Sequence, residues 1–187
     1  MLDKNMSKSE MENVLDEKGD FIQIDMISKF LDHSIGLKRD TKKFLFIRLA
    51  EIYERRLMIN EAAKMYDNLG ILVISYSEKI KYFLTEAKLF ISKGEFQRAD
   101  EAMKKAMSQA NSTERENIYF EVKNIYKELA RKYEENMMIS HAMRIYEKLL
   151  EMRLDSSERK DVKEKLLGFY DKLGERQKYS ILKGLGD

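Results

Sequence analysis

Apolar residues recur at helical spacing near the start of the chain. They follow one another at steps of three and four residues, at Phe21, Ile24, Ile27, Leu31 and Ile35. This spacing places them on one face of an amphipathic helix. Asp20 suits the N-cap of such a helix, and Gly36 suits its end, because glycine is common just past a helix C-terminus. We therefore expect a helix over residues 21–35.

Residues 1–19 show a different pattern. They carry many charges, few bulky apolar groups and no apolar stretch typical of a signal peptide. We expect a flexible N-terminal segment over residues 1–19 and a single helical domain over residues 20–187.

Beyond Gly36 the chain repeats itself. Each copy has a small residue, an aromatic residue three positions later, a second small residue nine positions after that, and a bulky residue four positions further on. The copies start 37 and then 43 residues apart. They read Ala50-x-x-Tyr53 with Ala62-x-x-x-Tyr66, Ala87-x-x-Phe90 with Ala99-x-x-x-Met103, and Ala130-x-x-Tyr133 with Ala142-x-x-x-Tyr146.

A fourth, incomplete copy follows 37 residues after the third, around Tyr170. Its segment Gly174-Glu-Arg-Gln-Lys178 mirrors Gly94-Glu-Phe-Gln-Arg98 of the second copy. This second match sets the register of the fourth copy independently of the aromatic positions.

The repeated register resembles the tetratricopeptide repeat family over about residues 42–184. The chain departs from the family pattern in lacking the leading tryptophan, the terminal proline and the regular spacing of roughly 34 residues. The resemblance implies an all-α fold, a right-handed α-solenoid of about 8–9 helices arranged as antiparallel hairpins. The repeats that it implies cover residues 43–76, 80–113, 123–156 and, in part, 160–187.

Composition narrows the classes of function. Proline is absent, which suits a nearly continuous helical chain, and the absence of cysteine excludes disulfides, thiolate zinc sites and cysteine nucleophiles. The 35 Lys and Arg are interspersed with 33 Asp and Glu, so a net charge of +2 gives no global attraction to nucleic acid. The longest apolar run, Ile71–Ile74, is too short to span a bilayer. We expect a cytoplasmic protein with no membrane insertion.

No pattern of catalytic, cofactor-binding or metal-ligating residues emerges. The eight glycines form no phosphate-binding loop. The only histidines, His33 and His141, belong to neither a His-x-x-His nor a Glu-x-x-His pattern. We expect no enzymatic activity, no cofactor and no metal.

The resemblance also implies that the first helix of each hairpin lines a concave groove. The first two copies place bulky apolar side chains at the positions that flank the core, and the middle of the chain places a basic set there. The groove residues expected from this register are Phe44, Ile47, Lys81, Leu84, Lys88, Ile91, Lys127 and Arg131. The fourth copy adds Asp161, Glu164, Gly168, Asp171 and Lys172. We expect a scaffold that binds an acidic peptide or an amphipathic helix there.

Three alternatives stay open. The apolar groove residues are either an open partner site or are covered by the helix over residues 21–35. The chain could form a homodimer through its repeat ends or its methionine-rich faces. Nucleic-acid binding through the lysine-rich middle helices is disfavoured by the net charge.

A basic pair, Lys127-x-x-x-Arg131, is similar to the carboxylate clamp of tetratricopeptide co-chaperones, but Ile47 and Glu51 stand where the companion pair would be.

Overall fold

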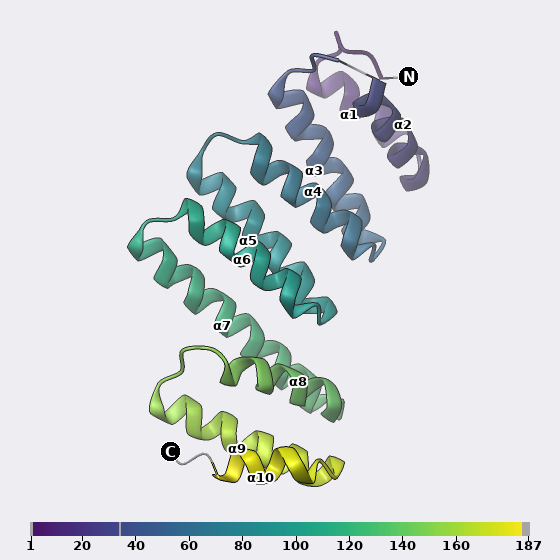
Figure 1. The fold of residues 1–187 in the computed structure, drawn as a ribbon. Helices are drawn as coiled ribbons and strands as arrows, with labels where there is room; N and C mark the ends of the chain where they lie inside the picture. Colours follow the sequence, from purple (N-terminus) through teal and green to yellow (C-terminus); the bar gives the residue numbers. More distant parts are fainter. Residues whose placement is uncertain (1, 34, 185–187) are drawn as a thin grey trace. The chain divides into compact units, whose positions relative to one another are not determined.

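A computed structural model describes residues 2–33 and 35–184 of the chain. In this part of the chain all regular structure is α-helical, which confirms the all-α class (Figure 1). The described residues form ten helices rather than about 8–9. Their bounds are α1 (Lys8–Asp16), α2 (Asp20–His33), α3 (Arg39–Arg55), α4 (Ile59–Leu72), α5 (Tyr76–Lys93), α6 (Phe96–Gln109), α7 (Ser112–Glu135), α8 (Ile139–Leu150), α9 (Ser156–Leu173) and α10 (Arg176–Gly184).

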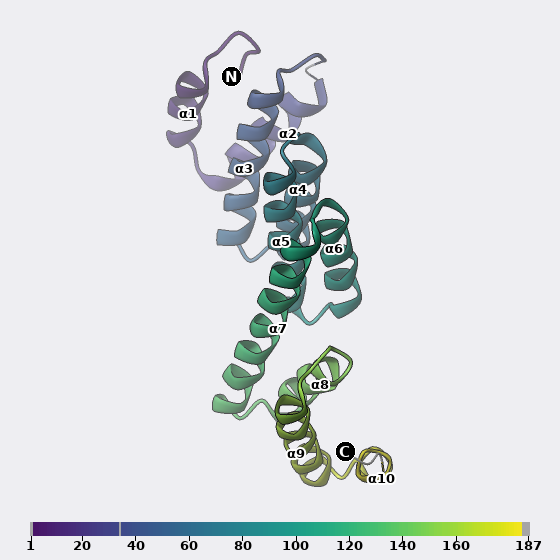
Figure 2. The same cartoon turned by 90° about the vertical axis from the view of Figure 1, so that its left-hand side faces the viewer.

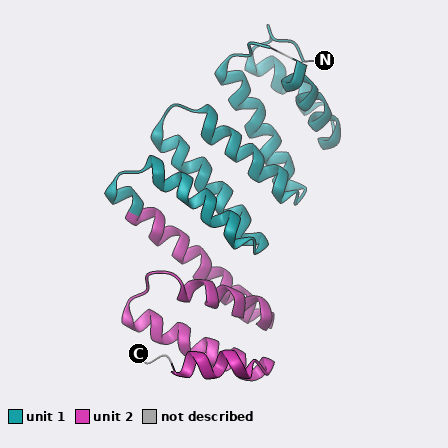
Figure 3. Ribbon diagram, viewed as in Figure 1, with its two compact units in different colours: residues 1–115 teal, residues 116–187 magenta. Residues whose placement is uncertain are grey.

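The chain divides into two compact units instead of the single domain expected over residues 20–187 (Figure 3). Unit 1 covers residues 1–115 and unit 2 covers residues 116–187, so the division falls within α7.

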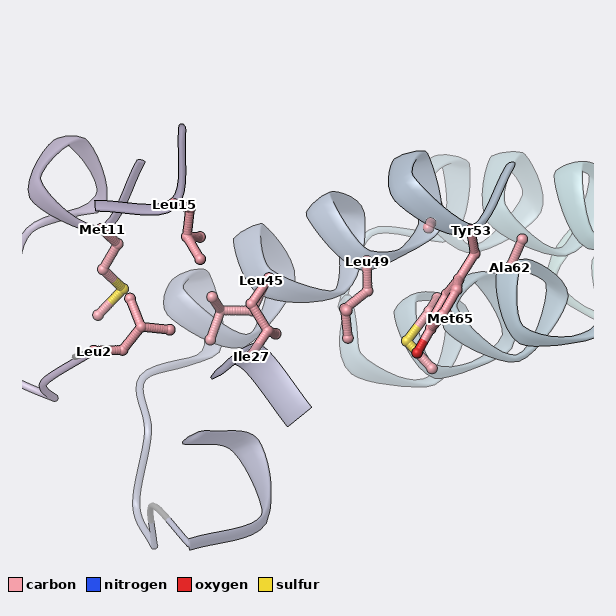
Figure 4. Close-up of a cluster of buried hydrophobic side chains, with 10 residues drawn as sticks. Leu2, Met11, Leu15, Ile27, Leu45, Leu49, Tyr53, Ala62 and Met65 are labelled. Carbon is pink, nitrogen blue, oxygen red and sulfur yellow. The ribbon is translucent and has the colours of Figure 1, made fainter. Parts of the chain in front are cut away.

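The N-terminal segment contains a helix where a flexible segment was expected. The hydroxyl of Ser7 accepts the N–H of Glu10, and the Glu10 carboxylate accepts the N–H of Ser7, so α1 starts with a complete capping box. Met11 and Leu15 on α1 are buried in a cluster with Ile27 of α2 and Leu45 of α3 (Figure 4). The sequence did not predict this helix, because only these two α1 side chains are buried and they form too short an apolar pattern among the charged residues.

Helix α2 covers residues 20–33 and so lies close to its predicted bounds. Only part of its apolar stripe reaches the core. Ile27 is fully buried, whereas Phe21 is 65% exposed and lies beside the guanidinium of Arg56, 4.7 Å from the ring centroid. Ile35 lies beyond the helix and is 98% exposed.

In unit 1, each helix from α3 to α6 packs against the next one along the chain (Figures 1 and 2). Gly70 lets α4 approach α5 closely, because a Cβ at this position would lie 2.5 Å from the ring of Phe83. In unit 2, α9 packs against both α8 and α10. The small residues of the repeat are buried in both units, with exposed fractions of 0–2% at Ala50, Ala62, Ala87, Ala99, Ala130 and Ala142.

The turn that follows the first helix of each hairpin is the same in all four copies. Its left-handed residue has φ between 57° and 76° at Leu57, Gly94, Met137 and Gly174. The N–H of this residue donates to the carbonyl three residues earlier at 2.9–3.2 Å, and the next N–H donates to the carbonyl five residues earlier at 2.8–2.9 Å. These bonds form a Schellman motif, which glycine accommodates without strain and a residue with a Cβ does not.

The longer spacing before the third copy comes from helix α7. Its counterparts α3 and α5 begin at Arg39 and Tyr76, and the same register predicts a start at Tyr119. Helix α7 begins seven residues earlier, at Ser112. Seven residues are close to two helical turns at about 3.6 residues per turn, so the extension leaves the buried face in register.

Candidate functional site

The two units carry equivalent residues 80 positions apart in the sequence. Helices α3–α6 of unit 1 correspond to α7–α10 of unit 2. Identical pairs at this spacing include Lys43 and Lys123, Glu54 and Glu134, Tyr66 and Tyr146, Glu78 and Glu158, and Gly94 and Gly174. The two units can therefore be compared position by position.

A tyrosine–glutamate hydrogen bond closes the first hairpin of each unit. The hydroxyl of Tyr66 donates to Glu54 Oε1 at 2.5 Å, and the hydroxyl of Tyr146 donates to Glu134. Burial raises the pKa of both tyrosine hydroxyls, and the hydrogen bond to the carboxylate raises it further, so both stay protonated donors.

A lysine–glutamate pair joins the first hairpin of each unit to the second. Lys43 of α3 pairs with Glu78 of α5, and Lys123 of α7 pairs with Glu158 of α9 at 2.9 Å. In unit 2 a second lysine, Lys127, lies 2.5 Å from the same carboxylate. The hydrogen bond from Lys127 is the main cause that lowers the pKa of Glu158, to about 2, against the effect of burial.

Two of the expected groove residues are buried. Ile91 is 0% exposed and Leu84 is 7% exposed, so neither is available to a partner in this structure. Ile91 occupies the position of Glu54 and Glu134, whose side chains reach the tyrosine on the second helix of their own hairpin. The groove assignment is wrong for Ile91 because its side chain is fully buried.

Phe44 and Ile47 are partly buried by other parts of unit 1. Phe44 packs against the cluster that contains Met11 and Leu15, and the ammonium of Lys8 lies 5.3 Å from its ring. Ile47 packs against the cluster of Leu69, Val73 and Tyr82. Both residues are therefore partly covered within unit 1, Phe44 by the cluster that includes α1 and Ile47 by residues at the end of α4 and in α5. Lys81 and Lys88 are exposed.

The remaining two expected residues, Lys127 and Arg131, line a cavity of about 750 Å³ in unit 2. Helices α7, α8 and α9 form its walls. Its lining consists of Lys127, Arg131, Glu134, Glu135, Tyr146, Leu149, Glu158, Asp161, Val162, Glu164, Lys165, Gly168, Phe169 and Lys172. The register had indicated Asp161, Glu164, Gly168 and Lys172 on α9, together with Asp171, which does not line the cavity. It had not indicated Glu158, Lys165 or the apolar residues Leu149, Val162 and Phe169.

Side-chain size explains why the corresponding region of unit 1 is filled. There the rings of Tyr66 and Tyr82 stack with centroids 6.2 Å apart, and Ile47 packs against Tyr82. In unit 2 Val162 stands in place of Tyr82, and Lys127 in place of Ile47. The ring of Tyr146 lies instead 5.7 Å from that of Phe169, with an interplanar angle of 44°.

Further replacements make the cavity open and polar. Glu164 takes the place of buried Leu84, and Gly168 takes the place of Lys88. A Cβ added at Gly168 would meet no atom within 4 Å, so the surface of α9 is accessible there.

The ion pairs in the cavity show that α7 and α9 run in the same direction. Glu158 pairs with Lys127, and seven residues further along both helices Lys165 pairs with Glu134 at 2.5 Å. Burial raises the pKa of Glu134, but the hydrogen bonds from Lys165 and Tyr146 and the charge of Lys172 outweigh it and leave the pKa lowered. Both carboxylates are therefore ionised and matched by the protein itself.

The described residues offer no group of three metal-ligating side chains, and no helix among them is long and apolar enough to cross a membrane. Two other cavities lie in unit 1. One of about 790 Å³ lies between the N-terminal residues and α2, and one of about 460 Å³ lies among α2, α3 and α4. Neither contains any of the expected groove residues.

No protein-family model matches the chain, and no curated protein or solved structure is significantly similar to it. The resemblance to tetratricopeptide repeats therefore rests on the repeated residues and turns alone.

Proposed function

We propose that this chain is a tetratricopeptide-like helical-repeat scaffold that binds a peptide segment of another protein in the unit 2 cavity. The repeated small and aromatic register and the four equivalent Schellman turns support the repeat architecture, a solenoid of helical hairpins. A cytoplasmic location and the absence of enzymatic activity belong to the same proposal.

The observation that carries the proposal is the difference between equivalent positions of the two units. A stack of Tyr66 and Tyr82 fills the space in unit 1, whereas Val162 and Gly168 leave a cavity in unit 2. The cavity is open to solvent, and many of its charged side chains are exposed, so they contribute little to the packing of the hairpins. Binding of a ligand would explain why the residues at these positions differ between the two units.

The size and the walls of the cavity suit a short stretch of peptide. Its volume of about 750 Å³ lies in the range of ligand sites, roughly 300–1,000 Å³. Buried Val162 and Phe169 provide an apolar floor, and charged side chains surround it. This combination of an apolar anchor with a few polar groups is typical of sites that recognise a peptide by its side chains.

The experiment is to select peptides from a random displayed library on the protein and to measure their affinities for two variants. Gly168→Leu places a side chain in the open space of the cavity. Lys160→Leu adds the same side chain to an exposed position of α9 that does not line the cavity. We expect the first substitution to weaken binding at least tenfold and the second to leave it unchanged. Equal affinities for both variants would contradict the proposal.

Self-association is the second candidate, favoured by two exposed apolar residues at the C-terminal end of unit 2. Ile181 of α10 is 58% exposed and Leu173 at the end of α9 is 40% exposed. Their counterparts in unit 1 are the charged residues Lys93 and Glu101. Light scattering over a range of concentrations tests this candidate. Self-association requires a molar mass above that of the monomer, and the Ile181→Lys substitution should lower this mass.

A further inference from the structure

The end of unit 1 where α4 passes into α5 exposes large apolar side chains beside basic ones. We propose that this end, the α4–α5 tip formed by residues 38–43 and 71–79, binds the surface of a membrane that contains anionic lipids. The contact is with the surface and does not cross the bilayer. This inference goes beyond the proposed function, because the peptide cavity belongs to unit 2.

The longest apolar run of the sequence, Ile71–Ile74, is only partly used by the core of unit 1. Val73 is buried, whereas Ile71 is 69% exposed and Ile74 is 70% exposed. Tyr76, two residues further on, is 67% exposed. Three large apolar side chains within six residues are therefore left in contact with solvent, and exposed apolar groups that cluster in this way mark interaction surfaces.

The start of α3 lies at the same end of unit 1. Ile47 of α3 packs against the cluster that contains Val73, and Lys43 pairs with Glu78 in the first turn of α5. The first turn of α3, which precedes Lys43, therefore lies beside the residues that join α4 to α5. The tip brings together two segments that are about 30 residues apart in the sequence.

The α4–α5 tip is basic. It contains five cations and two carboxylates, a net charge of +3. One of the carboxylates, Glu78, is paired with Lys43, and Asp67, one turn before the tip on α4, is paired with Lys105. Four cations of the tip have no ion pair among the described residues: Lys38, Arg39, Lys42 and Lys79. Anionic lipid headgroups attract cations of this kind, because their charge is not already matched within the protein.

The equivalent positions of unit 2, 80 residues later, lack this combination. They contain three cations and four carboxylates, a net charge of −1. Glu151 stands in place of Ile71, and Ser156 stands in place of Tyr76. Phe120 is the one large apolar residue exposed at these positions. The apolar and basic tip is therefore a property of unit 1 and not of the repeated framework.

The geometry of the tip favours a lipid surface over a folded partner. Its exposed side chains project from a helix end and the following loop, and none of them lines any of the three cavities described above. A hot spot between proteins packs into a complementary pocket, whereas an aliphatic side chain enters the boundary of headgroups and acyl chains without one. Tyr76 suits this boundary, where tyrosine is enriched, and the lysine side chains are long enough to keep their ammonium groups among the headgroups.

Co-sedimentation of the full chain with lipid vesicles tests the proposal. Vesicles of phosphatidylcholine alone are compared with vesicles that contain about 40% phosphatidylglycerol. We expect about tenfold tighter binding to the anionic vesicles, and weaker binding as salt screens the charges. Absence of binding to the anionic vesicles, or equal binding to both kinds, would overturn the inference.

Paired variants separate the two parts of the contact. Ile74→Ser with Tyr76→Ser leaves the charge unchanged and should weaken binding to anionic vesicles about tenfold. Lys38→Gln with Lys79→Gln should remove most of the preference for anionic over neutral vesicles. Leu57→Ser, at an 82% exposed position beyond the other end of α3, is the control and should bind as the native protein does. Binding that survives the apolar substitutions, or falls equally in the control, would contradict the assignment.

A fluorescent probe locates the contact directly. The chain contains no tryptophan, so Tyr76→Trp gives a single indole at the tip, and Leu57→Trp gives the matched control. On anionic vesicles the emission of the first variant should shift to shorter wavelength and be quenched by lipids brominated on their acyl chains, whereas the emission of the second should not change. A tip probe that stays in water while the chain sediments with vesicles would overturn the inference. Peptide binding in unit 2 is measured separately with Gly168→Leu, so the two proposals fail independently.

Discussion

Units 1 and 2 share a framework and differ in what fills it. Both close their first hairpin with a tyrosine–glutamate hydrogen bond, and both join their two hairpins with a lysine–glutamate pair. Between the hairpins, unit 1 has the stack of Tyr66 and Tyr82, whereas unit 2 has a cavity lined by charges. The comparison teaches that the framework contacts keep the fold while the interior between hairpins is free to become a site.

Unit 1 also contains a hairpin in which the tyrosine–glutamate pair is replaced by two apolar residues. In the second hairpin of unit 1, Ile91 and Met103 stand where the first hairpin of each unit has glutamate and tyrosine. Both members of the polar pair are replaced together, which avoids leaving a partly buried carboxylate or hydroxyl without its partner. The cavity of unit 2 therefore reflects a change of individual side chains on an unchanged scaffold.

The largest loss of stability is expected from a substitution that disrupts the tight packing between α4 and α5 of unit 1. Gly70→Ala places a Cβ 2.5 Å from the ring of Phe83, so the two helices must move apart. We expect the free energy of unfolding to fall by about 2 kcal/mol, as for other overpacked cores. Urea unfolding followed by circular dichroism measures it. The double variant Gly70→Ala with Phe83→Leu should recover part of the loss, and no recovery would contradict the clash.

Unit 2 depends more strongly on its inter-hairpin ion pair. Glu158→Gln leaves Lys123 and Lys127 without their carboxylate, and we expect a loss of about 1–2 kcal/mol at pH 7 after allowance for solvent screening. Glu78→Gln, at the equivalent and more exposed position of unit 1, should lose only about 0.5 kcal/mol. Equal losses would contradict the difference between the units.

The pH dependence of the same carboxylate gives an independent check. Its pKa in the folded protein is lowered from 4.5 to about 2. The stabilisation by Glu158 is therefore fully present above pH 4.5 and is lost as the pH falls toward 2. The difference in unfolding free energy between the native protein and Glu158→Gln should shrink over this interval. A difference that stays constant down to pH 2 would rule out the ionised carboxylate as its source.

Substitutions at the left-handed turn residues should change the free energy of unfolding by the same amount in both units. Leu57 and Met137 have φ of 57° and are 82% and 79% exposed, so their side chains add strain without filling the core. Leu57→Gly and Met137→Gly should each raise the free energy of unfolding by about 1 kcal/mol. Thermal unfolding monitors the change. Gly94→Ala and Gly174→Ala are the converse substitutions and should lower it by a similar amount.

The smallest expected effect concerns Gly168, an exposed glycine in the interior of α9. Gly168→Ala should raise the free energy of unfolding by about 0.5–1 kcal/mol, because alanine favours the helix and its Cβ meets no atom within 4 Å. The same substitution at Gly70 of unit 1 has the opposite sign. A loss of stability at Gly168 in chemical denaturation would show that its surroundings are not open.

The sequence predicted the features that depend on neighbours along the chain. Helical periodicity located the helices of the repeats, and the repeated register placed Leu57, Gly94, Met137 and Gly174 at equivalent positions, all of which are left-handed turn residues. These features are local, because a helix and its terminal turn are set by residues within a few positions of one another. Helix α1 was not predicted because its short apolar face is buried only by residues of other helices, such as Ile27 of α2 and Leu45 of α3.

Which of the predicted groove positions are exposed was decided by the tertiary structure. The register treated Ile91, Leu84 and Arg131 alike as flanking positions, yet the first two are buried and the third lines a cavity. Their exposure depends on side chains far away in sequence, such as Tyr82 filling the space in unit 1 where Val162 leaves it open in unit 2. The sequence alone determined a repeating helical framework, because its rules are local. Only packing between helices decided where that framework is open, because an open site depends on the volumes of all the side chains that meet there.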